Sequence, residues 1–69
     1  MIILYTTHCP QCEILEKKLK AKNFQYQVCD DIDTMLMKGF RAAPNLEVDG
    51  TVYNFRDAII WVNQQEAQV

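Results

Sequence analysis

The sequence has few of the residues that mark irregular, fibrous or disulfide-stapled proteins. Its 69 residues include only two glycines, two prolines and one histidine, and 49% of them are hydrophobic. This composition excludes collagen-like and disordered chains and indicates a globular fold. The cysteine count, three, is odd, which argues against a secreted disulfide framework and favours thiol chemistry or metal binding. A chain of this length supports one hydrophobic core, so we expect a single domain over residues 1–69.

Long apolar runs and excess positive charge are also missing. No segment approaches the roughly 20 apolar residues of a membrane span, and the start of the chain has no signal-peptide pattern. The formal net charge of −2 gives no general attraction for nucleic acid or for an anionic membrane. The basic run from Lys17 to Lys22 indicates a solvated helix end, where cations suit the dipole. We therefore expect a cytoplasmic monomer with neither nucleic acid nor a membrane as partner.

The hydrophobic pattern predicts the order strand, helix, strand, helix, strand, strand, helix. The expected elements are strands at 2–5, 25–28, 45–48 and 51–53, a helix from Pro10 to about Asn23, a short helix capped by Asp31 or Asp33 and ended by Gly39, and a last helix at 56–64. The continuous apolar run at 2–5 is typical of a central strand, and Asp49-Gly50 predicts a hairpin turn. Because crossovers are right-handed, the first two strands should be parallel. The fold class is therefore α/β, with helices packed around a small four-stranded mixed sheet.

The short helix between Asp31 and Gly39 carries an apolar side. Ile32, Met35 and Leu36 recur at the spacing of one helix face, and Phe40 is expected to pack inward after the helix ends.

Cys9 and Cys12 form a C-x-x-C pair at the junction between the first strand and the first helix. A helix N-terminus offers unpaired amides and a favourable dipole, which promote the thiolate form of Cys9. Cys12 lies one turn further along the same side, within reach of a mixed disulfide on Cys9. We therefore expect Cys9 to be the attacking sulfur and Cys12 the resolving sulfur. Pro10 and Gln11 carry no charge or metal ligand and should tune the rigidity of the loop.

Other interpretations of the cysteines remain open. Cys9, Cys12, Cys29 and His8 together match the Cys3His ligand count of tetrahedral zinc, although no second short-spaced pair is present. A structural disulfide would close only a very small loop and add little stability. Cys29 is expected at the end of the second strand as a small buried hydrophobe. The imidazole of His8 would stabilise a thiolate on Cys9 when protonated, or it is an exposed loop side chain.

With these motifs placed, nearly the whole chain resembles the glutaredoxin-like redoxins. The segment from Tyr5 to Cys12 resembles their active-site segment, and Ala43-Pro44 resembles their cis-proline position. The resemblance implies a thioredoxin-like, glutaredoxin-type three-layer sandwich of order βαβαββα. It also implies that Ala43 and Pro44 line the groove in which an extended substrate pairs beside Cys9.

Departures from ordinary glutaredoxins concern the glutathione site. Thr7 and His8 stand where the family has a lysine, and Tyr53-Asn54 replaces a Gly-Gly pair. Losing a cation and two sites of close backbone approach should weaken binding of an anionic tripeptide. Asn54-Phe55-Arg56 is instead similar to the S-G-F-R element of the NrdH-type redoxins, the hydrogen donors of class Ib ribonucleotide reductase. That resemblance implies electrons from NADPH through thioredoxin reductase rather than from glutathione.

We therefore expect a thiol-disulfide oxidoreductase that reduces protein disulfides, has no bound cofactor, and has ribonucleotide reductase as a candidate substrate. The alternatives are a glutathione-dependent glutaredoxin and a zinc-binding or redox-inert interaction module. The expected catalytic residues are Cys9 and Cys12, the expected substrate-binding residues are His8, Pro10, Gln11, Ala43, Pro44, Phe55 and Arg56, and no resident metal site is expected.

Overall fold

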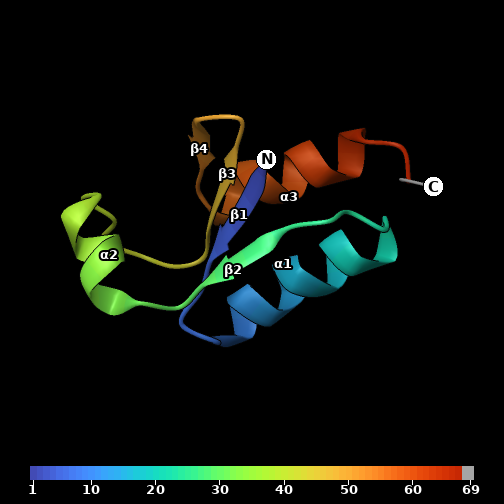
Figure 1. Ribbon diagram of the computed structural model, residues 1–69. Helices are drawn as coiled ribbons and strands as arrows, with labels where there is room; N and C mark the ends of the chain where they lie inside the picture. The colour runs from blue at the N-terminus through green and yellow to red at the C-terminus, as the bar shows by residue number, and fades with distance from the viewer. Residues whose placement is uncertain (68–69) are drawn as a thin grey trace.

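The chain forms a four-stranded mixed sheet and three helices in the predicted order (Figure 1). The computed structural model describes residues 1–67. Its elements are β1 (Ile2–Tyr5), α1 (Pro10–Ala21), β2 (Gln27–Cys29), α2 (Ile32–Met37), β3 (Asn45–Val48), β4 (Thr51–Tyr53) and α3 (Phe55–Gln64). The strands lie in the order β2-β1-β3-β4, with β1 parallel to β2 and antiparallel to β3, and β3 antiparallel to β4. The α/β class, the interior position of β1 and its parallel pairing with β2 are therefore confirmed.

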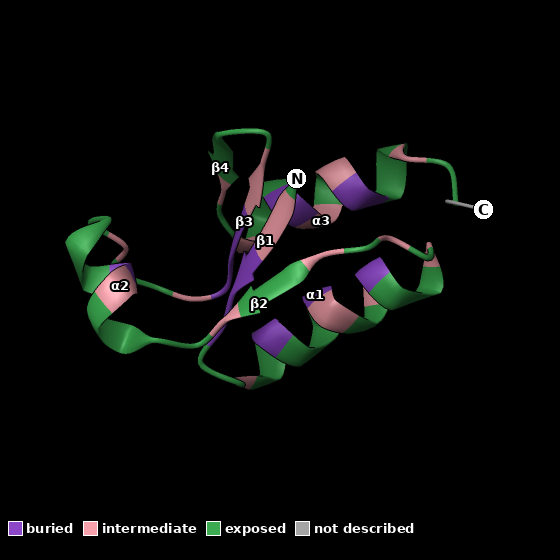
Figure 2. Ribbon diagram, in the orientation of Figure 1, coloured by how far each residue is buried: buried purple, intermediate pink, exposed green. Residues whose placement is uncertain are grey.

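One face of the sheet carries the core. Side chains with no exposed surface come from β1, β3, α1 and α3: Leu4, Leu15, Leu19, Leu46, Ala58 and Val62. The helices α1 and α3 pack together over this face, and the buried segments of all four elements face one another (Figure 2). Each fully buried leucine contributes about 1.5–3 kcal/mol relative to an exposed one. This layer holds α1, and with it the start of α1, rigidly against the sheet.

The opposite face is covered only at one end. The ring of Tyr5 meets that of Phe40 edge-on at 5.0 Å, and Lys38 Nζ lies 3.8 Å from Glu47 Oε1. Within α2 itself only Met35 is buried, and Figure 1 shows α2 set apart from the two packed helices. The expectation of helices on both faces is thus met only beside Tyr5.

The edge strand β2 differs from its predicted extent. The alternation of polar and apolar residues predicts a half-buried strand at 25–28, whereas the structure forms it at Gln27–Cys29. Tyr26 still packs against the core, but Val28 is 49% exposed. β2 lies at the edge of the sheet, where β1 is its one neighbouring strand. Its residues are therefore more open to solvent than those of β1 and β3.

Turns and caps follow the sequence closely. Asn23 has a φ of 60° directly after α1, and Asp49 and Gly50 have φ values of 49° and 89°, as a two-residue hairpin requires. Of the two candidate caps of α2 it is Asp31 whose carboxylate accepts from the Asp33 amide, at 3.2 Å. At residues 1–67 no helix has the length and apolar character needed to cross a bilayer.

Candidate dithiol site

The site lies in the loop that connects β1 to α1. Cys9 is the N-cap of α1, with extended backbone angles, and its Sγ accepts a hydrogen bond from the Cys12 amide at 3.2 Å. Its carbonyl accepts the first intrahelical bond, from the Glu13 amide at 2.9 Å. Pro10 occupies the first helical position, where a missing N–H costs nothing. The capping sulfur therefore faces the positive end of the helix dipole, an environment that favours an anion.

The two sulfurs of the pair are in contact but differ in exposure. Cys9 Sγ and Cys12 Sγ lie 2.6 Å apart, and both residues are free thiols. Cys9 is half-buried, whereas Cys12 is 1% exposed. An incoming disulfide can therefore reach Cys9 but not Cys12. This difference in exposure agrees with the expected roles, in which Cys9 attacks the substrate and Cys12 resolves the mixed disulfide.

The ionisation of Cys12 is made easier by its neighbours. Burial raises the pKa of its thiol, but hydrogen bonds with the Cys9 sulfur, the Thr6 hydroxyl and the backbone of Thr7 and Cys9 lower it more, to about 7. Because the sulfurs share a hydrogen bond, the remaining proton lies between them once the first is lost. A thiolate thus forms near neutral pH within the pair.

A loop far along the chain completes the site. The Ala43-Pro44 peptide bond is cis, which confirms the prediction at this position, and Pro44 is fully buried. The carbonyl oxygen of Ala43 lies 3.9 Å from Cys9 Sγ. The side-chain amide of Asn45 donates a hydrogen bond to the Ala42 carbonyl at 2.6 Å, and this bond fixes the backbone around the proline. The backbone before the proline is therefore placed beside the exposed sulfur.

His8 turns toward the end of the neighbouring strand. Its φ is 60°, its amide donates to Thr6 Oγ1 at 2.9 Å, and its Nε2 lies 3.3 Å from Asp30 Oδ2. Both side chains of this pair are about two-thirds exposed, at 65% and 66%. The imidazole is an exposed loop side chain paired with a carboxylate, and this contact gives no support to a direct role at Cys9.

Cys29 ends β2 as predicted, but it is half-buried rather than buried. Its carbonyl accepts from the Thr6 amide at 3.0 Å, which ties β2 to the segment that enters the dithiol loop. Over residues 1–67 no three His, Cys, Asp or Glu side chains lie where they could share a metal ion.

No protein-family model, no curated protein and no solved structure matches the chain. The function must therefore be inferred from the geometry of the dithiol and from the motifs in the sequence.

The remaining predicted site residues lie in three places. Gln11 is exposed on the first turn of α1. Phe55 is half-buried against the core and, with the exposed Arg56, borders a cavity between α1 and α3 that Ile14 and Lys18 also line. Ala43 lines another cavity, next to α2. The structure therefore does not bring Phe55 and Arg56 to the cavity beside the cis-proline loop.

Sequence reasoning missed three polar neighbours of the dithiol. Thr6 and Thr7 contribute hydrogen bonds to Cys12, the Thr7 hydroxyl at 3.9 Å from its sulfur, and Asp30 pairs with His8. Thr6 and Thr7 come just before the C-x-x-C motif in the sequence. Their hydroxyl groups could therefore have been predicted to lie near the cysteines. The position of Asp30 follows from the parallel pairing of β1 and β2, whose carboxyl ends meet at one edge.

Proposed function

We propose that the protein is a dithiol oxidoreductase of thioredoxin-like, glutaredoxin-type fold that reduces disulfides of other proteins in the cytoplasm. The observation that carries the proposal is the contact between a half-buried, accessible sulfur at a helix N-terminus and a buried sulfur with a pKa of about 7. The element order, the mixed sheet and the cis-proline beside Cys9 support the fold assignment. Resemblance of the Tyr5 to Cys12 segment to the glutaredoxin-like redoxins adds to it.

The proposed reaction transfers two electrons. The Cys9 thiolate attacks one sulfur of the substrate disulfide, so that a new S–S bond forms, the old one breaks, and the leaving sulfur takes up a proton. The Cys12 thiolate then attacks Cys9 Sγ and releases the second substrate sulfur as a thiol. The substrate is reduced to a dithiol, and the Cys9–Cys12 pair is oxidised to a disulfide. Because Cys12 Sγ is already within 2.6 Å of Cys9 Sγ, the second attack needs little movement.

The proposed electron source is NADPH through a thioredoxin reductase rather than glutathione. By the resemblance, the start of α3 corresponds to the Gly-Gly region of ordinary glutaredoxins, and here the Asp57 amide already has a partner. Asn54 Oδ1 accepts from the Asp57 amide at 2.8 Å, and the neighbouring Tyr53 ring packs against Trp61 with centroids 6.2 Å apart. A glutathione carboxylate would have to displace this cap. Ribonucleotide reductase is a candidate substrate on the resemblance of Phe55-Arg56 alone.

The test compares the two electron sources on one protein. Oxidised protein should be turned over by NADPH with thioredoxin reductase, and at most weakly by glutathione with glutathione reductase. Cys9→Ser should abolish reduction of a model protein disulfide, and Cys12→Ser should accumulate the mixed disulfide on Cys9, visible by mass spectrometry. Cys29→Ser is the matched control and should behave like the parent.

Two outcomes would contradict the proposal. Disulfide reduction that survives Cys9→Ser would remove the assigned nucleophile. Efficient turnover by glutathione without turnover by the reductase would make the protein a glutathione-dependent glutaredoxin instead.

A further inference from the structure

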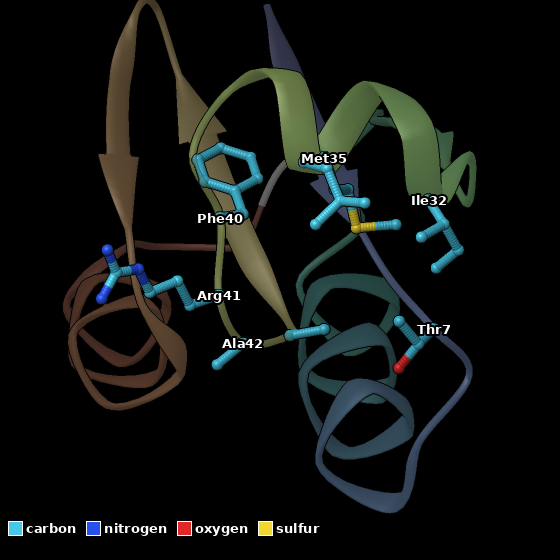
Figure 3. A pocket seen from close by; sticks show the side chains of 8 residues that line it. Thr7, Ile32, Met35, Phe40, Arg41 and Ala42 are labelled. Carbon is cyan, nitrogen blue, oxygen red and sulfur yellow. The ribbon is translucent and has the colours of Figure 1, made fainter.

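A cavity lies between α2 and the dithiol loop (Figure 3). Ile32, Met35 and Leu36 of α2 line one side of it, and Thr7 and Ala43 line the other. We call this space the α2 cavity. Figure 3 shows Ile32 and Met35 of α2 on one side of this space and Thr7, from the loop before α1, on another. The apolar stripe that the sequence predicts on the short helix therefore faces the dithiol side of the molecule.

Two residues that line the α2 cavity also contact the reactive sulfurs. Ala43 places its carbonyl oxygen 3.9 Å from Cys9 Sγ. Thr7, on the same side of the cavity, has its hydroxyl 3.9 Å from Cys12 Sγ. An extended peptide advances about 3.3 Å per residue. A segment whose cysteine is bonded to Cys9 would therefore place a neighbouring residue, one or two positions away, over the cavity.

The size and lining of the α2 cavity indicate its occupant. Its volume is about 230 Å³, below the roughly 300–1,000 Å³ of small-molecule sites. Met35 forms a buried floor, while Ile32 and Leu36 are 51% and 64% exposed. A single large apolar side chain would cover both of these exposed residues. Apart from Thr7 and Arg41, the side chains that line the cavity are apolar.

Charges at the two ends of the α2 cavity differ in sign. Ile32 lies between Asp31 and Asp33, both exposed. Arg41 also lines the cavity, on the side away from Ile32, and its side chain extends outward from there in Figure 3. An extended segment with an acidic side chain is therefore favoured in the orientation that brings this side chain to Arg41 and away from the aspartates.

We propose that the α2 cavity is a specificity pocket for one large apolar side chain of the substrate protein, within two residues of its reactive cysteine, in a segment whose acidic side chain faces Arg41. The proposal rests on the proposed function, because it concerns the substrate of the same dithiol. It assigns substrate choice to α2, the helix that contributes least to the core.

The test uses two short peptides whose single cysteine is joined by a disulfide to thiopyridine. The two residues on each side of the cysteine are leucine in one peptide and serine in the other. Attack by Cys9 on the peptide sulfur releases thiopyridine with the bonding electrons, and its absorbance gives the rate. Cys12 then attacks Cys9 and frees the peptide thiol. The parent should react with the leucine peptide about five to ten times faster, the effect of burying part of one such side chain.

Variants of α2 locate the preference. Ile32→Asn and Leu36→Asn are changes at exposed positions, and each should reduce the preference for the leucine peptide at least threefold, while the rate with the serine peptide stays the same. Met37→Asn is the matched control, because Met37 is 89% exposed on the same helix and does not line the α2 cavity. It should keep the full preference.

The outcomes separate this proposal from the proposed function. Equal rates with both peptides, or a preference that survives both α2 variants, would overturn the specificity pocket and leave the oxidoreductase intact. No reaction with either peptide, or reaction that survives Cys9→Ser, would refute the function itself. A third peptide carries one glutamate beside the leucines, and its glutamine counterpart should react with the parent protein about two- to fivefold more slowly. The Arg41→Gln variant should react with the glutamate and glutamine peptides at the same rate. Equal slowing of both proteins would refute the role of Arg41.

Discussion

Raising the pH from 6 to 9 should stabilise the reduced protein against unfolding. The pKa of the Cys12 thiol falls on folding from its ordinary 9.0 to about 7. A thiol with a depressed folded-state pKa contributes stability that is complete above the unfolded pKa and is lost as the pH falls through the folded one. With these two values the contribution is near zero at pH 6, about 1 kcal/mol at pH 8 and about 2 kcal/mol at pH 9.

The assay is urea unfolding of the reduced protein, followed by tryptophan fluorescence of Trp61, at each pH and in the presence of a phosphine reductant. The rise in the free energy of unfolding should disappear in Cys12→Ala, which has no thiol to ionise at this position. It should also shrink in Cys9→Ser, because the Cys9 sulfur makes the first of the hydrogen bonds that lower the pKa of Cys12.

Cys29→Ser is the matched control, and its stability should rise with pH as in the parent. A flat profile in the parent between pH 6 and 9, or one that Cys12→Ala leaves unchanged, would refute the reasoning. Only differences between profiles are compared, so the cavity left by Cys12→Ala does not enter the result.

Three further predictions concern packing, capping and a phenol. Leu46→Ala empties a fully buried position on β3 and should cost about 2–5 kcal/mol in urea unfolding; a loss under 1 kcal/mol would show that the core closes around the gap. Asn54→Ala removes the 2.8 Å cap on the Asp57 amide and should cost about 1 kcal/mol, whereas Asn54→Ser should retain most of it. Burial, then the charge and hydrogen bond of Glu16, raise the pKa of Tyr26 to about 12. Glu16→Gln should therefore move the phenolate absorbance transition of Tyr26 to lower pH. If the transition does not move, burial alone raises the pKa of Tyr26.

Much of the fold was accessible from the sequence because its signals are local. The continuous apolar run at Ile2–Tyr5, the helix that begins at Pro10 and the positive φ of Asp49 and Gly50 depend on residues within a few positions of one another. The cis bond before Pro44 is different. Its prediction came from resemblance to a family, because X-Pro bonds are mostly trans.

What the sequence could not predict depends on contacts between distant segments. Val28 has the same pattern as a buried strand residue, and its exposure follows from the edge position of β2. Ile32 and Leu36 look like core residues on a helix, but α2 reaches the sheet only at one end. The lowered pKa of Cys12 arises because hydrogen bonds from Cys9 and the two preceding threonines outweigh the effect of burial.

The C-terminal ends of α1 and α3 are joined to each other, and this determines on which side the protein can be immobilised. Lys22, just after α1, reaches back to the carbonyls of Asn63 and Gln65 at the end of α3. Figure 1 shows that the chain leaves α3 at the end of the molecule away from the beginning of α1. A tether joined on that side therefore holds the protein on a resin with Cys9 facing the solution, so an immobilised Cys12→Ser variant can serve as bait without its own anchor blocking the sulfur.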